Sequence, residues 1–167
     1  MTVVVSDTSP LNYLVIIGEV EILHRLYDKV LIPFEVLAEL EDAGAPPEVL
    51  RWVRARPDWL DVRWVDVQTG DAGLDQLDEG ERAAILLAEQ ESGALLIVDD
   101  AAGRAEANRR RIHNTGTLGV LRAAAIRGLV DLPAVLTRLV ATNFRAADSL
   151  LADLIAEDLE RKRRMDK

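Results

Sequence analysis

The sequence contains no cysteine among its 167 residues, and its aromatic residues make up only 4% of the chain. The first absence excludes disulfide bonds, thiolate metal ligands and a cysteine nucleophile. The second means that the core must be built from Leu, Val, Ile and Ala. No apolar run approaches the roughly 18 residues that span a bilayer, and the N-terminus lacks the pattern of a signal peptide. We therefore expect a cytoplasmic protein without a membrane segment.

Two enzyme classes lack their sequence signatures here. A Gly-rich loop followed by Lys and Ser or Thr, which binds nucleotide phosphates, does not occur. A phosphatase with an Asp nucleophile of the haloacid type needs an Asp-x-Asp pair after its first strand, and the chain has Asp7-Thr8-Ser9 there. Neither class explains the acidic residues described below.

The net charge of −9 argues against a generic nucleic-acid binder, but it is unevenly distributed. Residues 1–100 hold 7 Lys or Arg and 21 Asp or Glu, a balance of −14, whereas residues 101–167 hold 13 and 8, a balance of +5. One part of the chain can therefore supply carboxylates while the other faces a polyanion. The alternative is that the charges are solvated helix surfaces and a basic tail.

Strand-like and helix-like segments alternate along the chain. Short apolar or alternating runs predict strands near Val3–Val5, Val30–Ile32, Leu60–Trp64 and Ala94–Val98, and a Gly- and Asp-rich loop covers Gln68–Gly73. The spacing of apolar residues and the positions of proline and glycine predict helices between and after these strands. This alternation is typical of βαβ units, and it predicts a single α/β domain with a parallel sheet.

Acidic residues follow two of the predicted strands directly. Asp7 comes after Val3–Val5, and Asp99 and Asp100 come after Ala94–Val98. Because sites in such sheets form beyond the carboxyl ends of the strands, the carboxylates meet if these strands are neighbours. Like charges so close cannot all stay ionised in a partly dry pocket without a cation.

Two predicted helices can add further acids to the same edge. Glu39 borders the apolar stripe of its helix, and Glu81 extends the buried stripe of the helix that starts near Asp78. Each acid also has a simpler explanation. Asp7, Asp99 and Asp100 can cap the following helices, Glu81 can complete a capping box that begins at Asp78, and Glu39 can be an ordinary border residue.

A cluster of carboxylates suits metal-assisted hydrolysis of phosphodiesters. Oxygen ligands select Mg²⁺ or Mn²⁺. One or two such ions activate water and stabilise the attacking and leaving oxygens. A bound ion also allows an acidic pocket to accept a polyanion.

Five segments in order resemble one known family: SDTSPL, PFEVLAEL, LDEGERAAILLA, LLIVDDAAGRAEA and TGTLGVL. Together they resemble the PIN-domain ribonucleases, and most of all the prokaryotic PIN-like branch related to VapC toxins, over about residues 3–130. The resemblance implies a three-layer α/β/α sandwich with a central parallel sheet. It also implies one domain, with the nuclease fold in residues 1–145 and a C-terminal helix and basic tail in 146–167.

The resemblance carries specific roles to this chain. It implies Asp7, Glu39, Glu81 and Asp100 as catalytic residues, and Asp7, Glu81 and one of Asp99 or Asp100 as ligands of Mg²⁺ or Mn²⁺. The spacing after the strand favours Asp100. Gly103 stands where this branch usually has the alanine before Arg, and it leaves the acids intact.

The implied activity is a metal-dependent endoribonuclease acting on RNA, the toxin of a type II toxin–antitoxin pair. A small antitoxin protein and a second copy in a homodimer are the implied partners. The competing interpretation is a non-catalytic PIN-like regulatory or interaction domain.

Several polar residues are candidates for substrate contact. Thr8, Arg104, Thr115 and Thr117 can reach a phosphate or a bound water, although capping also explains the threonines near helix starts. The basic runs Arg109–Arg111 and Arg161–Arg164 can track RNA or lie on a solvated surface. We interpret the three tryptophans as core or partner contacts rather than base-stacking platforms: Trp52, Trp59 and Trp64.

Overall fold

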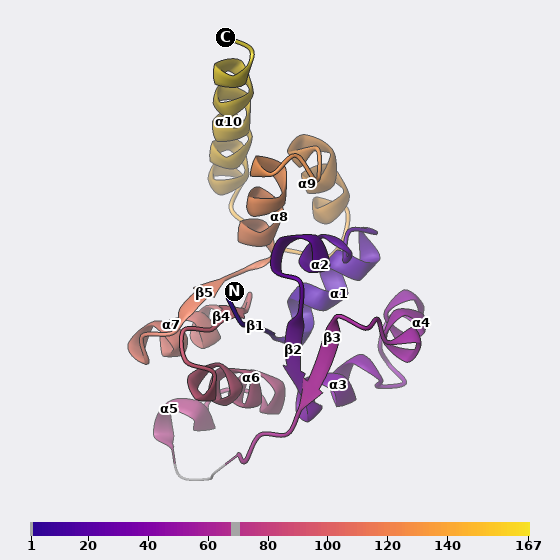
Figure 1. The fold of residues 1–167 in the computed structure, drawn as a ribbon, viewed down its shortest axis with the longest axis vertical. Helices are drawn as coiled ribbons and strands as arrows, with labels where there is room; N and C mark the ends of the chain where they lie inside the picture. The colour runs from indigo at the N-terminus through magenta and orange to yellow at the C-terminus, as the bar shows by residue number, and fades with distance from the viewer. Residues whose placement is uncertain (1, 68–70) are drawn as a thin grey trace. The chain divides into compact units, whose positions relative to one another are not determined.

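One parallel sheet of five short strands organises the N-terminal part of the protein (Figure 1). The computed structural model describes residues 2–67 and 71–167. The strands run in the spatial order β3-β2-β1-β4-β5. Their bounds are β1 (Val4–Ser6), β2 (Val30–Pro33), β3 (Leu60–Arg63), β4 (Leu95–Ile97) and β5 (His113–Thr115). β1 is therefore the central strand, and its carboxyl end lies between those of β2 and β4.

The register brings the predicted acids to the same edge. Ser6 at the end of β1 pairs with Ile97 at the end of β4, and the Asp7 N–H donates to the Ile97 carbonyl at 2.9 Å. The residues that follow these strands, Asp7 on one and Asp99 on the other, therefore leave the sheet side by side. β5 extends this edge, because Ile97 also pairs with Thr115.

Both faces of the sheet are buried, as parallel sheets require. Val5, Leu31 and Leu96 belong to a core cluster with Ile85 and Ala88 of α6. Successive strand residues point to opposite faces, and their neighbours Val4, Val30, Ile32 and Ile97 are buried as well, with α2 packed against β2. The fold is thus the predicted three-layer α/β/α sandwich. The helices are α1 (Thr8–Ile16), α2 (Ile22–Tyr27), α3 (Phe34–Leu40), α4 (Pro47–Ala55), α5 (Ala72–Asp75), α6 (Glu79–Gln90) and α7 (Ala101–Arg109).

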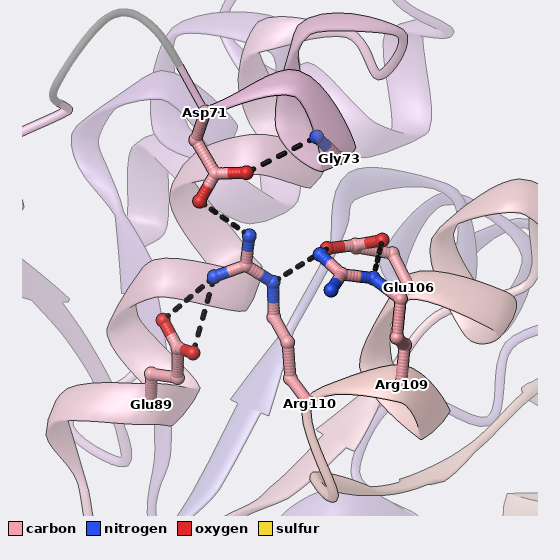
Figure 2. Close-up of polar contacts among 6 residues, drawn as sticks. All are labelled: Asp71, Gly73, Glu89, Glu106, Arg109 and Arg110. Carbon is pink, nitrogen blue, oxygen red and sulfur yellow. Dashed lines mark hydrogen bonds and ion pairs between the residues drawn. The ribbon is translucent and has the colours of Figure 1, made fainter.

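An ion-pair network around Arg110 ties α5, α6 and α7 together (Figure 2). The Arg110 guanidinium, 10% exposed, lies 2.6 Å from Asp71, 3.1 Å from Glu89 and 2.6 Å from Glu106. Arg109 pairs with Glu106 as well. The guanidinium of Arg110 is therefore held by three carboxylates, and neither of the two alternatives for this basic run, tracking RNA or a solvated surface, describes that residue.

The segment before α6 is more ordered than a plain loop. Of the predicted loop Gln68–Gly73, residues 68–70 lie outside the described residues. Asp71 accepts a hydrogen bond from the Gly73 N–H at 3.1 Å and so caps the short helix α5. The same carboxylate binds Arg110, which fixes the start of α5 relative to α7.

The chain divides into two compact units, with the boundary between Thr117 and Leu118. The second unit contains α9 (Leu132–Val140), α10 (Asp148–Met165) and all of α8 (Thr117–Ile126) except its first residue. α10 buries one residue, Asp158, which pairs with Arg161 at 2.5 Å and Lys162 at 2.8 Å. No helix among residues 2–67 and 71–167 is long and apolar enough to cross a membrane. The division of function between residues 1–145 and 146–167 stays a prediction.

Candidate active site

Asp7 is the most buried acid at the carboxyl edge of the sheet. Asp7 is only 4% exposed, and its Oδ1 atom is buried without a hydrogen-bond partner among the described residues. Asp7 occupies the N-cap position of α1, yet its side chain makes no capping bond. Burial, together with the nearby carboxylates of Glu81, Asp78 and Glu39, raises its pKa to about 8. Simple capping therefore does not explain this residue.

Glu39 reaches the same edge from α3. The Thr8 hydroxyl donates to Glu39 Oε2, which joins α3 to the segment that follows β1. The backbone of Gly80 also hydrogen-bonds Glu39, and a Cβ at Gly80 would lie 2.6 Å from Glu39 Oε1. Glycine at this position lets the carboxylate approach the start of α6. Burial and the charge of Asp78 raise the pKa of Glu39.

Glu81 completes the capping box that its sequence position allows, and it also lies among the other acids. Asp78 and Glu81 form a capping box at the start of α6, in which Glu81 N–H donates to Asp78 Oδ1 at 2.8 Å and Asp78 N–H donates to Glu81 Oε2 at 3.3 Å. Burial and the charges of Asp78, Asp100 and Glu39 nevertheless raise the Glu81 pKa to about 7. The cap thus holds Glu81 among the other acids.

The two acids after β4 have different surroundings. Both oxygens of Asp99 are occupied by Thr117, whose N–H donates at 2.7 Å and whose hydroxyl donates at 2.6 Å. Asp100 accepts from the Gly103 N–H at 3.1 Å and so caps α7, but it is exposed and its charge acts on Glu81. Burial raises the pKa of Asp99, opposed by the Thr117 bonds and Arg104.

The predicted substrate contacts also differ among themselves. Thr117 is fully buried and its hydroxyl is engaged by Asp99, so it fixes that carboxylate instead of presenting a group at the surface. The Thr8 hydroxyl is likewise engaged, by Glu39. Arg104 is exposed and its charge acts on Asp99, and Thr115 lies at the carboxyl end of β5. Arg104 and Thr115 remain the candidates at this edge.

The acids form an electrostatic cluster rather than a finished metal site. Within residues 2–67 and 71–167, no group of three or more Asp, Glu or His side chains is arranged to hold a metal ion. The donor chemistry still suits one. The unpartnered buried Oδ1 of Asp7 and the mutually raised pKa values of Asp7, Glu39 and Glu81 are what a divalent cation relieves.

Two features of this edge are not evident in the sequence. The first is the charge of Asp78, which acts on three of the four predicted acids. The sequence indicated Asp78 only as the first residue of a capping box. The second is an aromatic pair. Trp64 is 75% exposed and Phe34 is 47% exposed, and their rings meet edge to face with centroids 5.9 Å apart. Trp59 is buried, as a core tryptophan should be, but Trp64 is not a core residue.

The comparison with protein families covers nearly the whole chain. Residues 3–160 match a family model described as a PIN domain. No curated protein and no solved structure gave a match.

Proposed function

Since the chain belongs to the PIN-domain family, we propose that it is a metal-dependent endoribonuclease that hydrolyses phosphodiester bonds of RNA. PIN domains are usually nucleases, act on nucleic acids and generally bind divalent metal ions. The finer assignment, to RNA and to Mg²⁺ or Mn²⁺, rests on the residues at the carboxyl edge of the sheet.

The observation that carries the proposal is the state of Asp7. A carboxyl group that is buried, lacks a partner for Oδ1 and lies among other acids is unfavourable for the fold by itself. Such a group is retained where it binds a cation. Asp7, Glu81 and Asp100 are the residues that we expect to hold the ion, directly or through water, and Glu39 completes the acidic set.

When bound, the ion would activate a water molecule and neutralise charge on the phosphate. The chain's own residues prepare this edge. Thr8 orients the Glu39 carboxylate by donating to it, and the capping box holds Glu81 toward Asp100. Thr117 fixes Asp99, and Asp99 in turn attracts Arg104, whose guanidinium is the cation available for a phosphate.

The test is cleavage of single-stranded RNA in the presence of Mn²⁺. Asp7→Asn should reduce the rate at least about 100-fold, the scale on which charged groups at a reacting centre contribute, while the far-ultraviolet circular dichroism stays unchanged. Arg122→Ala is a suitable control, because Arg122 is a surface residue that pairs with Glu157. Equal cleavage by wild type and Asp7→Asn would remove Asp7 from the mechanism and the proposal with it.

We further propose that the protein is the toxin of a type II toxin–antitoxin pair, that it acts in the cytoplasm and that it forms a homodimer. The resemblance to the VapC-related branch supports these points. Expression of wild type but not Asp7→Asn should arrest growth, and co-expression of the product of a short adjacent reading frame should relieve the arrest. Light scattering of the purified protein gives the oligomeric state. Growth that is unaffected by wild type contradicts the toxin role.

The competing proposal is a non-catalytic PIN-like regulatory or interaction domain. One observation favours it: the described acids do not form a ready-made metal site. Calorimetry distinguishes the two proposals without any activity assay. A nuclease should bind Mn²⁺ and lose that binding in Asp7→Asn. A non-catalytic domain without a metal site should give no heat of Mn²⁺ binding in either protein.

A further inference from the structure

Aromatic and acidic residues follow the strands at the carboxyl edge of the sheet. Trp64 follows β3, Phe34 follows β2, Asp7 follows β1 and Asp99 follows β4. Because the strands are ordered β3-β2-β1-β4, the aromatic side chains lie at one end of the edge and the acids at the other. Neighbouring strands are roughly 5 Å apart, so the aromatic end directly adjoins the acids.

A pocket beside Phe34 of the aromatic pair extends to Glu39 of the candidate active site. This open pocket, about 350 Å³ in volume, is lined by Phe34, Glu35, Ala38, Glu39, Asp42 and Glu79. Glu39 thus belongs both to the acidic cluster and to the wall of this pocket. Inside the wall, Glu35 has a buried Oε2 without a hydrogen-bond partner among the described residues. The pocket therefore places the ring of Phe34 beside acidic side chains.

We propose that Phe34 and Trp64 form a stacking platform for an unpaired base of the RNA substrate, adjacent to the phosphodiester that is cut. This inference rests on the proposed ribonuclease function and names its substrate class as single-stranded RNA. Exposed aromatic rings beside a catalytic edge bind bases because every base has a flat π-face. A base within a duplex is already stacked and does not offer that face.

The charge of the pocket decides which part of the substrate enters it. Four of its lining residues are acidic: Glu35, Glu39, Asp42 and Glu79. These carboxylates repel phosphate, so the sugar–phosphate backbone is kept out of the pocket. A base is uncharged and carries N–H donors on its edge. The carboxylate oxygens that line the pocket can accept hydrogen bonds from such donors.

The first measurement is binding of a short single-stranded RNA labelled with fluorescein, followed by fluorescence anisotropy. The Asp7→Asn background keeps the RNA uncut. Phe34→Ala and Trp64→Ala should each raise the Kd about tenfold, the contribution of one stacked base. Trp64→Phe, which keeps a ring, should bind nearly as wild type does. Met165→Ala, which removes an apolar side chain that is 74% exposed, is the matched control and should change nothing.

A second readout follows the platform directly. Single-stranded RNA should quench the exposed Trp64 more than the buried Trp59, because a stacked base contacts its ring. Trp64→Phe should abolish most of this quenching while binding persists. A duplex of the same sequence should neither quench Trp64 nor respond to the two alanine substitutions. In steady-state cleavage, the alanine variants should raise KM and leave kcat nearly unchanged.

The outcomes separate this proposal from the nuclease assignment. RNA binding that depends on Trp64, in a protein that cuts no RNA, would refute the nuclease and keep the platform. Cleavage with an unchanged KM in both alanine variants would refute the platform and keep the nuclease. If Phe34→Ala or Trp64→Ala instead dissociates an oligomer and leaves the RNA Kd unchanged, the aromatic pair is a protein contact and the proposal falls. Wild type that binds no single-stranded RNA overturns both.

Discussion

Asp7 controls the electrostatics of the candidate active site. Its side chain is withdrawn from water and faces several like charges, so its charged form is disfavoured and its pKa rises to about 8. The pKa of Glu81, which is more exposed, is raised to about 7 by the same two causes, burial and neighbouring negative charges. In both cases the folded protein holds protons that the unfolded chain would release, and this couples folding to pH.

The first prediction concerns the stability of the metal-free protein. Because the folded pKa values of Asp7 and Glu81 lie above their unfolded values, the folded state binds more protons and stability falls as the pH rises from about 4 to about 8. Thermal unfolding in EDTA should show a Tm that drops across this window. Asp7→Asn should flatten the drop and raise the Tm at pH 8 by several degrees. A Tm that rises from pH 5 to pH 8 would contradict the assigned direction.

The second prediction separates the two roles of Glu81. Glutamine at position 81 can still complete the capping box, so Glu81→Gln should not lower the free energy of unfolding by more than about 0.5 kcal/mol, and it should weaken Mn²⁺ binding in calorimetry. Asp78→Ala removes the cap itself and should cost about 1 kcal/mol. If Glu81→Gln destabilises the protein as much as Asp78→Ala and leaves Mn²⁺ binding intact, Glu81 is a capping residue alone.

For single residues, the sequence predicts which acids lie at the ends of strands better than it predicts which side chains those acids contact. The place of Asp7 after a buried strand indicated a special carboxylate, and that place could be read directly. The difference between Asp99 and Asp100 could not, because it depends on Thr117, which is 18 residues from Asp99 and takes up both of its oxygens. The exposure of Trp64 was also hidden, since alternation with Leu60 and Val62 suggested a buried ring.

The helices and strands follow local signals closely where those signals are strong. Proline opens α4, and the Asp78 capping box opens α6. Two short elements were not predicted. All three residues of β5 are polar, and the strand exists because it pairs with β4. α5 is held by Asp71 and its ion pair with Arg110. Both depend on tertiary partners that lie far away in the chain.

The third prediction tests the Arg110 network. Arg110→Met removes a side chain, 10% exposed, that pairs with Asp71, Glu89 and Glu106 together, and it should destabilise the protein by about 2 kcal/mol. This is less than a wholly buried pair costs, because the Asp71 and Glu89 side chains are 41% and 39% exposed. Arg109→Met is the matched control. Its side chain is 62% exposed, and its loss should cost about 0.5 kcal/mol. Urea unfolding measures both free energies. Equal losses of stability would show that the ion pairs of Arg110 stabilise the protein no more than a surface pair does.

At the scale of the whole molecule, the sheet order turns separate acids into one cluster. The alternation of strands and helices predicts a parallel sheet, but it does not give the order β3-β2-β1-β4-β5. That order makes β1 and β4 neighbours and so brings Asp7 beside the residues after β4. The resemblance to PIN domains implied that these acids share a metal ion, but neither it nor the periodicity gave the strand order.

The fourth prediction concerns the response of the whole protein to metal. An ion that binds only the folded state at 100 times its Kd adds about 2.7 kcal/mol, which corresponds to roughly 5–10 °C in Tm for a chain of this size. Mn²⁺ should therefore raise the Tm at pH 8 by that amount in wild type and by much less in Asp7→Asn. Identical shifts in the two proteins would indicate binding elsewhere.

The most direct test is a crystal of the protein grown or soaked with Mn²⁺ and measured for anomalous scattering. The account predicts one or two anomalous peaks at the carboxyl ends of β1 and β4, ligated by Asp7 and within direct or water-bridged reach of Glu81 and Asp100. A fully occupied Mn²⁺ peak elsewhere, or Asp7, Glu81 and Asp100 side chains that turn away from one another in saturating Mn²⁺, would contradict it.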